Sequence, residues 1–380
     1  MAREWAKVEL SEEGMREGMQ IEDANISVED KIRLIDALSK TGIKNINVGS
    51  FVSPKYTPQM EKIDEIVTGF HPEDTVRYYA LALNERGVQR AQEYSPPLDM
   101  SRRNIPRLGC HQCDVFIRRN ANRSQADEIA RWPSVVAAAK ENGATEAGIG
   151  TNASWGSNFL GEFSHEDRMS YLERQHGMWD EAGIKVVSVS LGDPMSWCRP
   201  WVVAEQLEII KKRWPEINQW GLHLHDARGF ALASTYAALE VLEPKDTLSI
   251  DTTIGGIGGC PYCGNGRATG MAPTEDIVNM LNEMGIETGI DLDQVVRVVW
   301  MLEEVLGRPT MGHVSKAGPL PRGEKRYDAN MPFVETFQQA KHFLLGPSVY
   351  EGGIYPWAKP IESPALDQSR VDHAVPVGGD

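Results

Sequence analysis

Two histidines stand two residues apart, His223 and His225, in the strand-like run 221–225. Alternate residues of a strand point to the same face, so both imidazoles can reach one metal ion. A satisfied histidine pair in a protein core is the alternative interpretation. The turn-forming residues 226–229 follow directly, which places the pair at the carboxyl end of a strand, where α/β proteins build their sites. The pattern therefore favours a metal site.

A second polar cluster, residues 12–20, follows the strand-like run 6–10. It contains a guanidinium, Arg16, and a carboxylate, Glu17. A carboxylate can ligate a divalent metal, and a guanidinium can stabilise a developing negative charge on oxygen. Together with the histidines, these residue types predict a divalent metal beside an oxyanion site.

The chain of 380 residues is 41% apolar and 24% charged, which is ordinary for a globular enzyme built as one large α/β barrel or two medium domains. Its net charge of −15 argues against nucleic acid and anionic membranes as partners, because both require basic surfaces. Residues 1–7 contain no apolar signal core, and no apolar stretch approaches the ~18 residues of a membrane span. Five cysteines, an odd number, fit a reducing compartment. We expect a cytoplasmic protein.

Eight strand-like runs alternate with helix-like segments along the chain. This alternation is typical of repeated β-α units, and eight such units close a barrel. We therefore predict an α/β protein with a (β/α)8 TIM barrel. The expected strands are residues 7–10, 45–51, 78–84, 114–118, 146–152, 185–191, 221–225 and 247–253.

Helical patterns fill the gaps between these runs, and a glycine follows each of the clearest ones as a C-terminal cap. These helices are expected at residues 28–41, 125–142 and 166–182. The barrel is expected to occupy residues 1–308. Past it we expect a helical and coil extension or lid over residues 309–362, with one helix at 331–345, and a disordered tail over residues 363–380.

Four short motifs occur in barrel order. They are Arg-Glu-Gly-Met-Gln at 16–20, Ser-Phe-Val-Ser-Pro-Lys at 50–55, the His-x-His pair, and Gly-Gly-Cys-Pro-Tyr at 258–262. Together they resemble the 3-hydroxy-3-methylglutaryl-CoA lyases and their relatives, the DRE-TIM metallolyases, over roughly residues 6–305. The resemblance implies a (β/α)8 barrel and a Mg²⁺ or Mn²⁺ ion, with Zn²⁺ as a further candidate. It also implies cleavage or formation of a carbon–carbon bond through an acyl enolate.

The resemblance assigns a role to each candidate residue. Arg16 would stabilise the enolate oxygen, while Glu17, His223 and His225 would ligate the metal, with His223 also counted among the catalytic residues. Cys260 stands where these lyases carry a loop cysteine that assists proton transfer. A coordinated cation would lower the pKa of a substrate hydroxyl, and a fixed guanidinium would stabilise the enolate that follows. A thiol on a Gly-rich loop could then protonate the enolate carbon.

The chain departs from the family pattern at three positions. Glu17 stands where the family has Asp, and this longer carboxylate can still ligate. Asn47 stands where the family has a glutamate before the Ser-Phe-Val motif, so a negative charge beside the metal ligands is missing. Gly270 aligns with the family's last metal ligand, an Asn. Asn265 or a water is the expected substitute, and a site with three protein ligands is the alternative. These departures leave the acyl substrate open.

Two Cys-x-x-Cys pairs, residues 110–113 and 260–263, suggest a structural zinc site as a rival interpretation. The first pair precedes the expected fourth strand, and the second follows the eighth. We therefore expect the two pairs at opposite ends of the barrel, outside bonding reach of each other. Cys110 and Cys113 would then be small apolar residues near the bottom of the barrel.

Polar residues near the expected strand ends are further pocket candidates, because barrel sites are built there. Loop bracing is the alternative role, since turns also select Asn, Asp and Ser. Trp155, Trp197 and Trp201 near the same mouth could line an apolar substrate site or pack in the core. The candidate substrate-binding residues are Gln20, Asn47, Ser50, Arg118, Asn152, Asp193 and Thr253.

The leading hypothesis is a metal-dependent lyase that splits a 3-hydroxyacyl-CoA, similar to hydroxymethylglutaryl-CoA, into acetyl-CoA and a keto compound. The alternative is a condensing acyltransferase of the isopropylmalate or citramalate synthase type, or an aldolase acting on a free acid. A third hypothesis, motivated by Asn47 and Gly270, is an inactive barrel that acts as a binding protein. The expected partner is a small molecule, a CoA thioester, and a homodimer is compatible with the fold by analogy.

Overall fold

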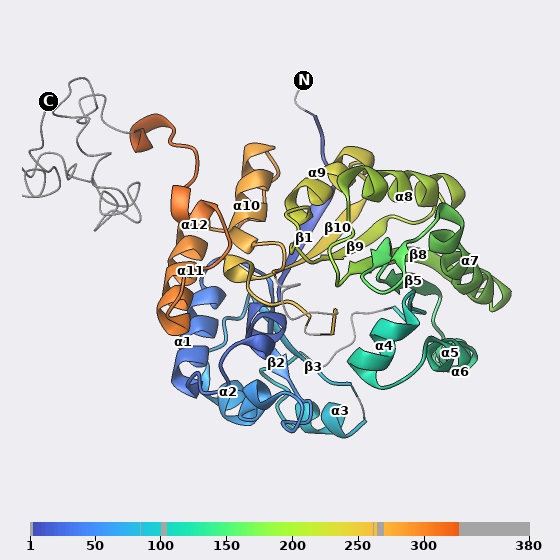
Figure 1. Cartoon of the computed structure of the whole chain (residues 1–380), viewed down its shortest axis with the longest axis horizontal. Coiled ribbons are helices and arrows are strands. Elements are labelled where there is room, and N and C mark those ends of the chain that lie inside the picture. The colour runs from blue at the N-terminus through green and yellow to red at the C-terminus, as the bar shows by residue number, and fades with distance from the viewer. Residues whose placement is uncertain (1–2, 84, 100–104, 261, 264–269, 327–380) are drawn as a thin grey trace, which may run out of the picture. The chain divides into compact units, whose positions relative to one another are not determined.

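The structure is a computed structural model, and it describes residues 3–83, 85–99, 105–260, 262–263 and 270–326 (Figure 1). The chain divides into two compact units, Met1–Gly312 and His313–Asp380. The expected helix 331–345, the expected tail 363–380 and the candidate ligand Asn265 lie outside the described residues.

Eight strands form one parallel sheet in the first unit. They are β1 (Lys7–Glu12), β2 (Asn45–Ser50), β3 (Arg77–Leu81), β4 (Cys110–His111), β5 (Glu146–Asn152), β8 (Lys185–Asp193), β9 (Gln219–Leu224) and β10 (Thr247–Thr252). β1 pairs with β2 on one side and with β10 on the other, so the last strand returns to the first. The sheet order is β3-β2-β1-β10-β9-β8-β5-β4, and the predicted (β/α)8 barrel is confirmed. Seven of the eight predicted strands are confirmed, with ends shifted by a few residues.

Helices lie around these strands in Figure 1. None of the described helices is long and apolar enough to cross a membrane. The α-helices of the first unit are α1 (Val28–Ser39), α2 (Ile63–Gly69), α3 (Glu85–Gln92), α4 (Asp114–Ala121), α5 (Gln125–Ala130), α6 (Trp132–Glu141), α7 (His165–Glu181), α8 (Pro200–Arg213), α9 (Ala231–Val241), α10 (Thr274–Glu283) and α11 (Leu292–Leu306). Shorter elements are the π-helical turn η1 (Gly14–Gly18), the 3-10 turns η2 (Met19–Ile21), η3 (Pro58–Met60) and η4 (Ile254–Gly256), and the hairpin of β6 (Gly156–Ser157) and β7 (Gly161–Glu162). The second unit contains α12 (Val314–Ala317) and the 3-10 turn η5 (Gly323–Lys325).

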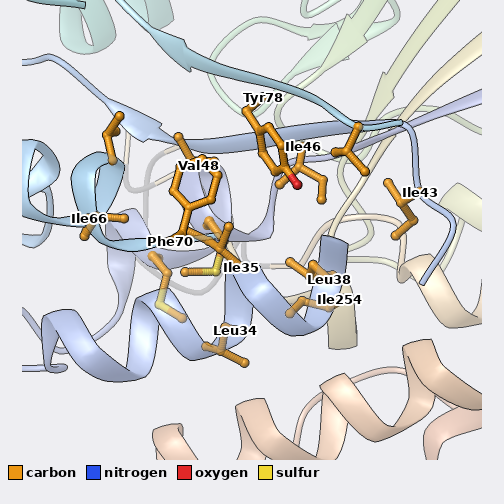
Figure 2. Close-up of a cluster of buried hydrophobic side chains, with 14 of the residues drawn as sticks. Leu34, Ile35, Leu38, Ile43, Ile46, Val48, Ile66, Phe70, Tyr78 and Ile254 are labelled. Atoms are coloured by element: carbon orange, nitrogen blue, oxygen red, sulfur yellow. The ribbon is translucent and has the colours of Figure 1, made fainter. Parts of the chain in front are cut away.

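A buried apolar cluster joins α1 to β2. Leu34, Ile35 and Leu38 lie on one face of α1, as their spacing of three and four residues requires, and all three are fully buried. They belong to the same cluster as Ile46 and Val48 of β2 (Figure 2). Truncating such a leucine to alanine costs about 2–5 kcal/mol. This packing fixes β2, which carries the predicted site residues Asn47 and Ser50.

The predicted fourth strand, residues 114–118, is wrong, because these residues begin the helix α4. The fourth strand is the two-residue β4, in which Cys110 pairs with Thr151 of β5. Cys113 is the N-cap of α4, and its sulfur accepts a hydrogen bond from the Phe116 N–H. The Val-Phe-Ile sequence within this run has a high strand propensity, but the cap and the packing of its buried face decide in favour of a helix.

The predicted helix over residues 125–142 is wrong as a single element, since it is divided into α5 and α6. Pro133 occupies the first turn of α6, where its missing N–H breaks no hydrogen bond. In a continuous helix the Pro133 ring would clash with the backbone carbonyl four residues earlier, so α5 ends before Pro133. The other two predicted helices are confirmed with end shifts of one or two residues, as α1 and α7.

Candidate metal centre and active site

Three predicted metal ligands converge at the carboxyl end of the barrel strands. One ligand atom from each of Glu17, His223 and His225 lies within 4.8 Å of the other two. The imidazoles come from β9 and the residue just past it, and their ring centroids are 5.3 Å apart. The carboxylate comes from η1, with Glu17 Oε1 3.7 Å from His225 Nε2. The sequence prediction that these side chains share one site agrees with this geometry.

His223 is held by Asp251, a residue that the sequence analysis missed. The two residues are register partners on β9 and β10, and His223 Nδ1 lies 2.8 Å from Asp251 Oδ2. Burial opposes protonation of His223, but the Asp251 carboxylate raises its pKa above the ordinary value. A carboxylate bound to one ring nitrogen orients the ring and presents the other nitrogen to a metal. The only sequence signal was that Ser249 and Asp251 alternate with apolar residues along β10.

His225 has the properties of a neutral metal ligand. Its side chain is 1% exposed, and burial lowers its pKa to about 3. Within the part of the chain that the structure describes, its Nδ1 has no hydrogen-bond partner. A buried polar atom without a partner is costly and calls for an explanation at that site. A carboxylate beside two imidazoles provides the donors for a divalent cation, and the residues therefore fit such an ion.

Arg16 lies between two carboxylates at the same site. It forms ion pairs with Glu13, at 2.7 Å between Nη2 and Oε2, and with Glu17. Burial disfavours the charged guanidinium, but both carboxylates act to raise the pKa of Arg16. Burial likewise disfavours ionisation of Glu17, but Arg16 and the two imidazoles lower its pKa below the ordinary value. Arg16 and Glu17 are therefore both charged at neutral pH, and the guanidinium is directed toward the candidate metal ligand Glu17.

Glu12 ties the end of β1 to the loop that follows β10. Its Oε1 accepts hydrogen bonds from the N–H groups of Gly14, at 2.8 Å, and Ile254, at 3.0 Å, and its Oε2 accepts one from Thr274. The side chain is fully buried, and this burial raises its pKa to about 7. Glu12 therefore braces η1 against η4, and so fixes the turn that carries Arg16 and Glu17.

Two predicted substrate-binding residues lie within the charged network. The Gln20 side chain makes a hydrogen bond with Glu17, which helps to lower the pKa of that carboxyl. Asn47 donates from Nδ2 to Glu13 Oε2 at 3.0 Å. Ser50, at the end of β2, is 3% exposed. Contact of these residues with a substrate stays a prediction.

Three other predicted residues bond to loop backbone. Asp193 is fully buried and accepts hydrogen bonds from two N–H groups of its own turn, at positions 195 and 198. Burial raises the pKa of Asp193 to about 6. Thr253 donates to the Ile257 carbonyl at 2.7 Å, and Asn152 accepts from the N–H of the next residue. These bonds correspond to the bracing role that the sequence analysis held as the alternative.

Arg118 does not follow a strand, so its predicted place at a strand end is wrong. It lies in α4, where its side chain is 61% exposed and forms an i,i+4 ion pair with Asp114 at 2.6 Å. The error follows from the misassigned fourth strand.

The tryptophans predicted near the barrel mouth differ in burial, since Trp155 is fully buried, whereas Trp201 on α8 is 63% exposed.

The prediction that the two cysteine pairs lie at opposite ends of the barrel is also wrong. Cys113, Cys260 and Cys263 belong to one buried cluster with Phe116, Ala153 and Met195. The reason is that β4 ends at residue 111, so Cys113 follows a strand instead of preceding one. Among the described residues, the cysteines form no group of three or more potential metal ligands.

The loop that carries Cys260 runs against η1. Gly258 has a φ of +106°, and a Cβ at this position would lie 2.9 Å from the Glu17 carbonyl oxygen. Only a glycine allows this backbone conformation and this close approach without strain. Gly270, which aligns with the family's last ligand, has no side chain to offer, and its carbonyl accepts a hydrogen bond from the Asp226 N–H at 2.7 Å.

Comparisons with known proteins agree with this geometry. The HMGL-like family model matches residues 7–301. Hydroxymethylglutaryl-CoA lyase YngG of Bacillus subtilis is 33% identical over 80% of this chain and 94% of its own length. The (R)-citramalyl-CoA lyase of Chloroflexus aurantiacus is 31% identical over 80% of this chain and 93% of its own length. A crystal structure of the Bacillus subtilis HMG-CoA lyase has a TM-score of 0.67 and 31% identity, covering 83% of this chain and 99% of that chain.

Proposed function

Because the chain belongs to the HMGL-like family, we propose that it is a divalent-metal-dependent carbon–carbon lyase that cleaves a 3-hydroxyacyl-CoA into acetyl-CoA and a keto compound. The convergence of Glu17, His223 and His225 beside Arg16 supports this proposal most directly. The relatives are named hydroxymethylglutaryl-CoA lyase and (R)-citramalyl-CoA lyase, and both names contain a CoA thioester. A CoA thioester is therefore the proposed substrate class.

The proposed ion is Mg²⁺ or Mn²⁺, with Zn²⁺ as the competitor. A carboxylate oxygen suits the first two ions, whereas imidazole suits zinc, and thiolates favour zinc most strongly. Within the described residues, the ligand group contains no cysteine. When bound, the ion would orient the substrate hydroxyl and lower its pKa. Glu17, His223 and His225 would hold it, and Asp251 would orient His223.

The remaining steps use side chains of this chain. In the proposed cleavage the hydroxyl proton passes to solvent water, and the oxygen forms a carbonyl while the bond between C2 and C3 breaks. The electron pair of the broken bond forms the acetyl-CoA enolate. Arg16 would donate hydrogen bonds to the enolate oxygen from a fixed position, which costs little reorganisation in the transition state. The Cys260 thiol would then give its proton to C2, which completes acetyl-CoA.

An acetyl-CoA release assay tests this proposal. The protein is stripped of metal and assayed on a panel of 3-hydroxyacyl-CoA thioesters, with and without added Mg²⁺, Mn²⁺ or Zn²⁺. We expect release that depends on metal and that is lost in His223→Ala, with the fold intact by circular dichroism. His176→Ala is the matched control, because His176 stacks on Trp214 outside the site. If no thioester of the panel releases acetyl-CoA, the proposed lyase activity is contradicted, and an aldolase, a synthase or an inactive barrel is favoured.

A further inference from the structure

Glu13 is a buried carboxylate that the family motifs do not assign. It directly follows β1 and its side chain is almost fully buried. The backbone carbonyl of the same residue accepts hydrogen bonds from the N–H groups of Arg16, Glu17 and Gly18, which form η1. Glu13 therefore starts the turn that carries both the guanidinium and the metal-binding carboxylate.

Both oxygens of the Glu13 side chain have strong donors. Oε2 accepts from Arg16 Nε at 2.9 Å and from Asn47 Nδ2 at 3.0 Å, and Oε1 accepts from the Tyr79 hydroxyl at 2.8 Å. Burial raises the pKa of the Glu13 carboxyl, whereas Arg16 and the Tyr79 hydroxyl act to lower it, because they stabilise the ionised form. Charge-assisted bonds of this kind hold the guanidinium in one orientation.

Strand register explains why these residues meet. Glu12 pairs with Ile46, so the next residues along β1 and β2 are Glu13 and Asn47. Asn47 in turn is the register partner of Tyr79 on β3. Glu13, just past β1, therefore lies level with Asn47 within β2 and Tyr79 within β3, which is why one carboxylate can accept from both neighbours.

Asn47 is the uncharged partner of Glu13 on the neighbouring strand. Its amide donates to Glu13, which a carboxylate at the same position cannot do. Two carboxylates at this distance would repel each other or share a proton. The structure therefore favours one negative charge in this pair of positions, and here that charge belongs to Glu13.

We propose that Glu13 is the positioning residue of the Arg16 guanidinium, and that it supplies, from the end of β1, the one negative charge that the paired positions of Glu13 and Asn47 hold. This inference rests on the proposed function, in which Arg16 stabilises the enolate. Glu13 acts through Arg16, and does not itself contact the reacting atoms. It matters most when the metal is bound, because Glu17 must then share its carboxylate between the metal and Arg16.

The test exchanges the charge between the two positions. Four proteins are compared: the wild type, Glu13→Gln, Asn47→Glu, and the double variant with both changes. We expect Glu13→Gln to lower kcat about 10–100-fold with a smaller change in KM, because a displaced guanidinium mainly affects the transition state. Asn47→Glu should also lower kcat, because it brings two carboxylates together. The double variant should regain kcat to within about fivefold of the wild type, because the new amide can donate to the new carboxylate.

Glu9→Gln is the matched control, because Glu9 lies on the same strand but is exposed and paired with Lys7. It should leave kcat unchanged. Thermal unfolding midpoints of all variants report whether they fold. A wild-type kcat for Glu13→Gln, or a double variant no better than the single ones, would overturn the proposal.

Mn²⁺ affinity, measured by electron paramagnetic resonance, separates this inference from the proposed function. Without Glu13, Arg16 is left with Glu17 as its ion-pair partner among the described contacts and competes with the metal for that carboxylate. We expect about tenfold weaker Mn²⁺ binding in Glu13→Gln and recovery in the double variant. If the variants show this pattern of Mn²⁺ affinity but the wild type releases no acetyl-CoA, the role of Glu13 is supported and the proposed lyase activity is contradicted. Equal Mn²⁺ affinity in all four proteins would overturn the inference.

Discussion

The two sides of the barrel mouth differ in what their polar side chains bind. On the side formed by β1, β9 and β10, here called the charged side, ionisable side chains bind one another, as Arg16 binds Glu13 and His223 faces Asp251. On the side formed by β4, β5 and β8, here called the sulfur side, Asp193 accepts from loop N–H groups, and Cys263 donates to a loop carbonyl at 2.9 Å. The comparison teaches that the buried guanidinium and the candidate metal ligands gather on the charged side, whereas Asp193 and Cys263 on the sulfur side bond to loop backbone.

Cys260 is the exception that tests this division most strongly, because it packs in the sulfur side but is assigned a chemical step. Cys260→Ala should lower kcat about 10²–10⁴-fold, the range that general acid catalysis supplies. Mn²⁺ affinity should not change, because the thiol is not a proposed ligand. Cys263→Ala is the matched control and should stay close to the wild type in steady-state assays. Equal losses in the two variants would instead mean that the whole sulfur cluster supports the site by packing.

A second prediction concerns the stability of the charged side. The pKa of Glu12 in the folded protein, about 7, lies above the ordinary value of 4.5, so the folded state retains a proton that the unfolded chain has released. The stabilising contribution of Glu12 is therefore complete below pH 4.5 and is lost as the pH rises through 7. The free energy of unfolding in urea is measured for the wild type and for Glu12→Gln at pH 4.5 and at pH 8. Relative to the variant, the wild type should lose up to roughly 3 kcal/mol of stability between these two pH values. A difference that does not vary with pH would contradict this assignment.

The third prediction sharpens the role of the residue beside His223. Asp251→Asn removes the charge that orients this imidazole while it keeps the shape of the side chain. We expect Mn²⁺ affinity to fall about 10–100-fold, as for other partners of metal-bound histidines, with little change in the thermal midpoint. Calorimetric titration of the metal-free protein measures this directly. Unchanged affinity would show that β9 alone orients His223.

The smallest effect is expected for Arg118, on the sulfur side. Its ion pair with Asp114 is exposed, and such pairs contribute about 0–1 kcal/mol. Arg118→Ala should therefore leave kcat, KM and the thermal midpoint nearly unchanged. A large increase in KM for the CoA thioester would restore Arg118 as a substrate-binding residue and would extend the site onto α4.

The barrel could be predicted from the sequence because strand and helix patterns repeat along the chain, and each is a local property. The prediction failed at residues 114–118, where an apolar run has the same composition whether it forms a strand or the buried face of a helix. That single error displaced Arg118 and the first cysteine pair as well. Cys113 and Cys260 consequently meet in a cluster that the sequence prediction had separated.

The sequence by itself determined the candidate metal ligands that lie close together in the chain. His223 and His225 share a face because strand side chains alternate, and Arg16 precedes Glu17 within one turn. Only the tertiary structure decided their partners. Asp251 on β10 contacts His223 on the neighbouring strand β9. Glu13, at the end of β1, accepts hydrogen bonds from Asn47 on β2 and from Tyr79 on β3. The physical reason is that periodicity orients a side chain within its own strand, whereas register between strands depends on closure of the whole barrel.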